Sequence, residues 1–126
     1  MIQLNRCKTI LTFYAHPDDE TLAAGATINK LANLGSDVHV AIPATGVHAR
    51  RNIKDKPERD SDLIELRKNC KEALAILGVP PDNIYLGDFP DNEVDKHSLL
   101  ELIQWVEKII NNVKPDLVLT HHRYCT

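Results

Sequence analysis

Residues 9–35 read TILTFYAHPDDETLAAGATINKLANLG, an apolar run followed by a polar turn and an amphipathic stretch. The run Thr9–Tyr14 is β-branched and aromatic, and it has the length of a strand buried in a parallel sheet. From Leu22 to Ala32 the apolar residues recur every three or four positions, which predicts a helix. Gly35 then stands where a helix end favours left-handed backbone geometry. The stretch therefore predicts a strand, a turn and a crossover helix.

The same alternation continues along the rest of the chain. Three further strands are expected, at Val38–Ile42, Asn83–Leu86 and Leu117–Thr120. Two further apolar stripes predict helices, one from Leu63 to Leu77 opened by Asp62 and one from Leu99 to Val113 capped by Ser98. Strands that alternate with helices require a parallel sheet with right-handed crossovers. We therefore expect a Rossmann-like, three-layer α/β fold with a mostly parallel sheet and helices on both faces.

Composition narrows the class of protein. The chain has 126 residues, 43% of them apolar, and a formal net charge of −3, which is typical of a single globular domain. Mild acidity argues against a nucleic-acid partner, and no apolar stretch approaches the ~18 residues of a membrane span. Without a signal-like segment in residues 1–12, a cytoplasmic location is expected. Three cysteines outside C-x-x-C spacing, Cys7, Cys70 and Cys125, are read as reduced and without a role.

Polar residues follow each predicted strand, and in parallel sheets ligands bind at these carboxyl ends. The most informative segment is His16-Pro17-Asp18-Asp19-Glu20, which places an imidazole and three carboxylates within five residues. Such carboxylates repel one another, and a divalent cation offsets that cost better than a helix dipole does. His16 and Asp19 are three apart around a turn, so both can face one cation while Asp18 stays unliganded.

One nitrogen and one oxygen ligand suit zinc, and iron or another divalent transition metal fits the same donors. The alternative is that Asp18, Asp19 and Glu20 only cap the helix. A second polar segment, Arg50 to Arg59, carries five cationic residues. It is read either as a solvated loop or as a mobile loop that brings cations to an anionic or polar substrate.

Ala15–Glu20, together with the Thr21–Ile28 helix start and Thr45-Gly46 after the second strand, resembles the PIG-L/LmbE-like superfamily of zinc-dependent N-deacetylases. Phe89–Asn92 and Pro115–His121 resemble motifs that come later in the sequences of that family. The likeness runs from Ile10 to His121, and the hexapeptide is its most specific part. Family members share the Rossmann-like fold and typically remove an acetyl group from N-acetylglucosamine units of glycoconjugates by means of a single zinc.

The resemblance implies a role for each matching residue. His16 and Asp19 would be zinc ligands, and Asp18 would be the general base that takes a proton from a metal-bound water and passes it to the leaving amine. Further residues are expected to contact substrate: Arg50 first and Arg51 second by their forked donors, His121 by orienting substrate or bracing the metal site, and Asp91 and Asn92 by bonding a sugar. Surface-loop and turn readings remain open for these last residues.

The chain departs from the family at its third zinc ligand, which lies several residues past the fourth strand in a motif that ends in Asp-His. Either residues 1–126 are the amino-terminal part of a longer family domain, or His121 or His122 serves as a substitute ligand. Two protein ligands alone would hold zinc weakly. We therefore expect one Rossmann-like deacetylase domain over residues 1–126, with the third ligand unassigned.

Three hypotheses follow. The first is a metal-dependent N-deacetylase that acts on a small-molecule N-acetylated amino sugar, with a homo-oligomer allowed. The second is a non-catalytic α/β binding module or inactive fragment with an incomplete metal site. The third, a nucleotide-binding domain, ranks last because the first turn has carboxylates where a G-x-G-x-x-G phosphate cradle would stand.

Overall fold

The computed structural model of the chain describes residues 6–46, 56–90 and 98–122. The strands in these ranges are β1 (Thr9–Phe13), β2 (Asp37–Ala44), β3 (Ile84–Phe89) and β4 (Leu117–Thr120). The helices are α1 (Asp19–Asn33), α2 (Lys56–Ile76) and α3 (Leu99–Val113), and a 3-10 turn, η2 (Pro81–Asn83), precedes β3. Strand and helix thus alternate as predicted.

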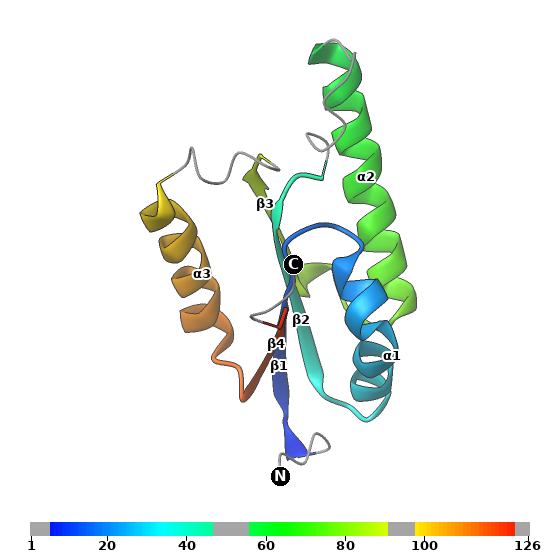
Figure 1. Cartoon of the computed structure of the whole chain (residues 1–126). Coiled ribbons are helices and arrows are strands. Elements are labelled where there is room, and N and C mark those ends of the chain that lie inside the picture. Colours follow the sequence, from blue (N-terminus) through cyan, green and yellow to red (C-terminus); the bar gives the residue numbers. More distant parts are fainter. Residues whose placement is uncertain (1–5, 47–55, 91–97, 123–126) are drawn as a thin grey trace.

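The four strands form one parallel sheet in the order β3-β2-β1-β4. Helices α1 and α2 cover one face of the sheet and α3 covers the other, as Figure 1 shows. From β1 the chain runs outward to β2 and then to β3 on one side of the sheet. It then crosses to the other side of β1, where β4 pairs with it, so the strand order reverses at β1. The Rossmann-like fold with helices on both faces is therefore confirmed, and β1 lies at its centre.

The main core lies between the sheet and the pair of helices α1 and α2. Ile10, Val40 and Ile42 of the sheet are buried there against Ile28 of α1 and Leu74 of α2. Each such side chain contributes about 1.5–3 kcal/mol on burial. A smaller cluster under α3 joins further apolar and aromatic residues of both layers: Leu11, Ala41, Ile109, Phe13, Tyr85, Trp105 and Val113.

Strand β3 is longer than the sequence predicted. The expected strand ended at Leu86, whereas the observed strand continues through Gly87 to Phe89. A register shift between Ile42 and Ala44 of β2 brings Pro43 close to this segment. A Cβ at Gly87 would lie 2.4 Å from the Pro43 carbonyl oxygen, so only glycine lets the two strands stay paired here.

Helix α2 begins earlier than predicted. The expected start was Asp62, and Arg50–Arg59 was read as a loop, yet the helix includes Lys56, Pro57 and Arg59. A proline is tolerated in the first turn, where its missing N–H has no helical partner in any case. The loop prediction for that part of the segment is therefore wrong.

Four apolar residues assigned to buried stripes are exposed instead: Leu22, Leu99, Ile103 and Ile110. Leu22 of α1 is 81% exposed and Leu99 of α3 is 70% exposed. The buried face of α1 runs through Glu20, Ala24, Gly25, Ile28 and Leu31, so the predicted stripe is confirmed at Gly25, Ile28 and Leu31 and is wrong at Leu22. The predicted serine cap is confirmed, because the Ser98 hydroxyl accepts a hydrogen bond from the Leu100 N–H.

Cys70 is a free, buried thiol, and burial, helped by the charge of Glu20, raises the pKa of this thiol to about 11. That thiol is protonated and unreactive at neutral pH. Cys125 lies outside the described residues. Among the helices described, none is long and apolar enough to cross a bilayer.

Candidate active site

The turn that joins β1 to α1 carries the candidate chemistry at the carboxyl end of the central strand. Tyr14 leaves β1 and donates its N–H to the Ala41 carbonyl of β2, while the Ala15 carbonyl accepts from the Ala44 N–H. These bonds hold the start of the turn beside β2. The turn then passes through His16 to Asp18, and α1 begins at Asp19.

Asp18 has an unusual backbone conformation, with φ 111° and ψ −32°. A non-glycine residue in such a sparsely populated region costs about 1–3 kcal/mol, and strain of this kind concentrates at functional sites. Asp18 occupies the N-cap position of α1, but its side chain makes no capping bond and is exposed. For Asp18, the alternative that its side chain caps the helix is therefore wrong.

His16 and Asp19 lie together as the spacing predicted. His16 Nδ1 is 3.4 Å from Asp19 Oδ2, and that same oxygen accepts the backbone N–H of His16 at 3.1 Å. Two ligands at zinc-like bond lengths of a tetrahedral ion are about 3.4 Å apart, so the pair fits two corners of such a site. Both side chains are partly exposed, at 47% and 29%.

A third metal ligand does not emerge from the described ranges. Within them, no group of three or more His, Cys, Asp and Glu residues is arranged to hold a metal ion. The residues present therefore fit two positions of a zinc site and leave the rest of it unassigned.

His121 reaches the same turn from the end of β4. Its Nε2 lies 3.4 Å from Asp19 Oδ2 and accepts the Ala15 N–H at 3.0 Å. The ring of Tyr14 packs against it edge-on, with ring centroids 4.9 Å apart. Because the Ala15 N–H occupies the Nε2 lone pair, that nitrogen braces the turn in this arrangement and does not act as a substitute metal ligand.

Burial and the negative charge of the turn both raise the pKa of the Tyr14 phenol. Burial raises the pKa of its phenol, and the nearby carboxylates of Asp19 and Glu20 raise it further. A phenol in this setting stays protonated at neutral pH. The turn is thus a concentrated region of negative charge beside a buried aromatic residue, which favours an incoming cation.

The loop after β2 packs closely on this turn. Gly46 has φ 79°, and a Cβ there would lie 3.1 Å from Pro17 Cδ and 2.8 Å from Leu66 Cδ2. Thr45 is buried and donates its N–H to the Phe89 carbonyl at the end of β3. The carboxyl ends of β1, β2 and β3 therefore meet here, as the fold predicts.

Four of the residues expected to contact substrate cannot be placed. Arg50, Arg51, Asp91 and Asn92 lie outside the described residues. Their roles stay predictions, as do those of His16, Asp18, Asp19 and His121, although these four are gathered around one turn.

The sequence argument missed the burial of Glu20, which is 1% exposed. It was counted only as one of three acids in the turn. A usable signal was present, because Glu20 precedes Ala24 by four positions and Ile28 by eight, so it shares the buried face of α1.

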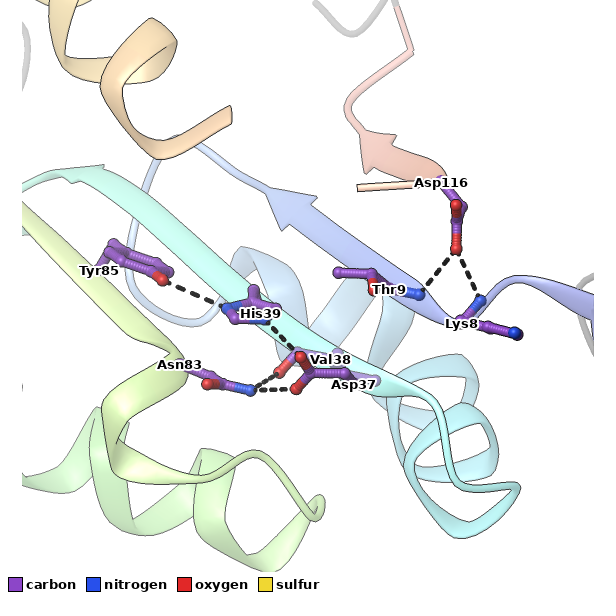
Figure 2. Close-up of polar contacts among 8 residues, drawn as sticks. All are labelled: Lys8, Thr9, Asp37, Val38, His39, Asn83, Tyr85 and Asp116. Atoms are coloured by element: carbon purple, nitrogen blue, oxygen red, sulfur yellow. Dashed lines mark hydrogen bonds and ion pairs between the residues drawn. The ribbon is translucent and has the colours of Figure 1, made fainter. Parts of the chain in front are cut away.

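A second polar cluster lies at the opposite, amino end of the strands (Figure 2). His39 is buried between Asp37, whose Oδ2 is 3.1 Å from Nε2, and Tyr85, whose hydroxyl is 3.3 Å from Nδ1. The Asn83 amide donates to Asp37 Oδ1 at 2.7 Å and to the Val38 carbonyl at 3.0 Å. His39 thus has a structural role in which its ring nitrogens face Asp37 and Tyr85.

The family follows from comparison with known proteins. The pattern of the PIG-L family, described as GlcNAc-PI de-N-acetylase, matches residues 11–126, which is most of the chain. This chain belongs to the PIG-L family. The match includes the His16–Glu20 turn, β4 and His121, so the elements that build the candidate site are family elements.

Individual relatives point the same way. A probable N-acetyl-alpha-D-glucosaminyl L-malate deacetylase 2 of Bacillus cereus is 30% identical over 90% of this chain and 51% of its own length. The solved N,N'-diacetylchitobiose deacetylase of Pyrococcus horikoshii is 25% identical, with a TM-score of 0.77 over 91% of this chain and 41% of that one. The chain spans about half the length of the curated relatives it matches.

A second similar structure supports the fold alone. GalB, the 4-carboxy-2-hydroxymuconate hydratase of Pseudomonas putida, is 22% identical, with a TM-score of 0.76 over 93% of this chain and 49% of that one. At this identity the likeness confirms the parallel α/β architecture and carries no argument about chemistry.

Proposed function

We propose that the chain hydrolyses the acetamide of an N-acetylglucosamine-containing substrate as a metal-dependent N-deacetylase. The observation that carries the proposal is the geometry of the β1–α1 turn. There Asp18 has a strained backbone, its side chain makes no capping hydrogen bond, and it adjoins the His16–Asp19 pair. Membership of the PIG-L family and the deacetylase names of the relatives support the same reaction. They do not favour a non-catalytic binding module.

His16 and Asp19 are the residues that would hold zinc in this chain. Bound there, zinc would supply the Lewis acidity that makes water attack an amide at neutral pH and that polarises the acetyl carbonyl. Ferrous iron suits the same nitrogen and oxygen donors. Because His16 is about half exposed, an ion can approach the pair from solvent.

Asp18 would act as the general base in this reaction. Its exposed carboxylate makes no capping bond, so it is available to accept a proton from the attacking water and return it to the leaving amine. The Ala15 N–H bond of His121 keeps the ring of that residue beside Asp19, where it would steady the turn during the reaction. Arg50 and Arg51 remain candidates for holding sugar hydroxyls.

Acetate release from N-acetylglucosamine tests the proposal. The zinc-loaded chain is expected to release acetate, to stop when a chelator removes the metal, and to recover when zinc is added back. Release that is indifferent to chelation would contradict metal dependence. A zinc-loaded, folded chain that releases no acetate from N-acetylglucosamine or its glycosides would contradict the deacetylase proposal itself.

A further inference from the structure

We propose that Glu20 is a positioning residue that fixes the backbone of Asp18 and thereby sets the direction of the Asp18 carboxylate. The inference rests on the proposed function, because it concerns the group that would act as general base. Glu20 itself lies beneath the turn and contributes no atom to the exposed surface where substrate would bind, since it is 1% exposed.

The burial of Glu20 is the first argument. It is the only buried carboxylate among the described residues. Removing a carboxylate from water is costly unless its oxygens are hydrogen-bonded. Both oxygens are bonded within the turn: Oε2 accepts the Asp18 N–H at 3.1 Å, and Oε1 accepts the Thr21 hydroxyl at 2.9 Å. One carboxylate oxygen of Glu20 therefore holds the backbone of Asp18, and the other bonds the Thr21 side chain in the first turn of α1.

The backbone of Asp18 is held from both sides. Glu20 accepts its N–H, and its carbonyl accepts the N–H groups of Thr21 at 3.0 Å and Leu22 at 2.9 Å. With both peptide groups bonded, the residue keeps φ at 111°. The direction of a side chain follows from its backbone dihedrals, so these bonds determine where the Asp18 carboxylate points.

The arrangement also explains why Asp18 does not cap its own helix. An aspartate at an N-cap normally has extended backbone geometry and bonds the N–H groups of the first turn. The conformation held by Glu20 is incompatible with that geometry. Without the bond from Glu20, Asp18 would relax to an ordinary N-cap, and its carboxylate would turn away from solvent toward the helix N–H groups.

A matched pair of substitutions separates positioning from charge. Glu20→Gln keeps the length and an acceptor oxygen but loses the charge, whereas Glu20→Asp keeps the charge but is too short to span the turn. Ile28→Val, which trims a buried side chain two turns further along α1, controls for general loss of stability. The readouts are kcat and KM for acetate release from N-acetylglucosamine by the zinc-loaded chain, and the hydrogen-exchange rate of the Asp18 amide by NMR.

A positioning role predicts that Glu20→Asp lowers kcat about 100-fold with little change in KM, because a small misplacement of a reacting group has this effect. Its Asp18 amide should exchange at least about tenfold faster than in the wild type. Glu20→Gln should keep the amide protected and retain kcat within about tenfold. Ile28→Val should change neither readout.

A protected Asp18 amide in Glu20→Asp would show that Glu20 does not hold that residue. A kcat that is preserved better in Glu20→Asp than in Glu20→Gln would assign Glu20 an electrostatic role instead. If the wild type releases no acetate, the proposed function fails, and the amide exchange of the two variants still decides whether Glu20 fixes Asp18.

Discussion

The two ends of the parallel sheet both carry clusters of acids and histidines, yet the clusters are built differently. At the amino end, the acids and the histidine are bonded to other side chains or to the backbone: His39 lies between Asp37 and Tyr85, and Asp116 Oδ2 accepts the N–H groups of Lys8 and Thr9 at 2.9 and 3.0 Å (Figure 2). At the carboxyl end, Asp18 is strained, exposed and without a capping bond.

The difference shows how structural and chemical uses of the same residue types can be told apart. The amino-end groups connect neighbouring strands, so their hydrogen bonds are already satisfied in the folded chain. At the carboxyl end, Glu20 and the Asp19 oxygen that faces His16 bond the turn itself, and the Asp18 carboxylate is left available. The parallel fold predicts functional polar residues only at the carboxyl ends of the strands, and there the Asp18 carboxylate is available to react.

Zinc binding should separate the two ends most strongly. His16→Ala is expected to weaken zinc binding at least about 100-fold, since even residues that only orient a ligand contribute 10–100-fold. His39→Ala removes an imidazole whose nitrogens face Asp37 and Tyr85, so it should leave zinc affinity unchanged. Isothermal titration calorimetry with zinc measures both. Equal affinities for the two variants would contradict the assignment of the metal to the carboxyl end.

Removal of one amino-end hydrogen bond should affect stability and leave chemistry unchanged. Tyr85→Phe deletes the hydroxyl 3.3 Å from His39 Nδ1, and a bond of this kind contributes about 1 kcal/mol to the free energy of unfolding. Urea denaturation measures the loss, while acetate release reports on the other end. A large drop in kcat for this variant would show that the two ends are coupled.

The smallest effect is expected from acid titration of the amino end. The hydrogen bond from His39, with help from Asn83, holds the pKa of Asp37 below its ordinary value. The unfolded chain then binds the proton more readily, so the stabilisation is present above the ordinary pKa of aspartate, about 3.9, and is lost as pH falls through the lower folded value.

Asp37→Asn should therefore be less stable than the wild type at pH 7, by about 0.2–1 kcal/mol because the carboxylate is largely exposed. The gap should close in acid, as denaturation at pH 7 and pH 3 would show. A gap that widens as pH falls would contradict the sign of the Asp37 pKa shift.

Much of the fold was predictable because its signals are local. Apolar runs and helical stripes gave the element order, and parallel pairing followed from the alternation. The misses have one non-local and one local cause. The extension of β3 depends on the close approach of Gly87 to Pro43, and the early start of α2 depends on a proline within its first turn.

The site was predictable in its residue types and less so in its geometry. The three-residue spacing predicted that His16 and Asp19 would meet, and their side chains do so at 3.4 Å. The sequence patterns did not indicate the positive φ of Asp18, although the bonds that hold it, to Glu20, Thr21 and Leu22, are all local. The Ala15 N–H bond to His121 joins residues 106 positions apart, so no local pattern could have revealed it.

The most direct test places one substitution at each end of the sheet and measures kcat for acetate release from N-acetylglucosamine by the zinc-loaded chain. Asp18→Asn removes the proposed base, so kcat should fall by on the order of 10²–10⁴. Asp37→Asn makes the same chemical change in the amino-end cluster and should leave kcat unchanged. Turnover by Asp18→Asn that matches that of Asp37→Asn would contradict the account.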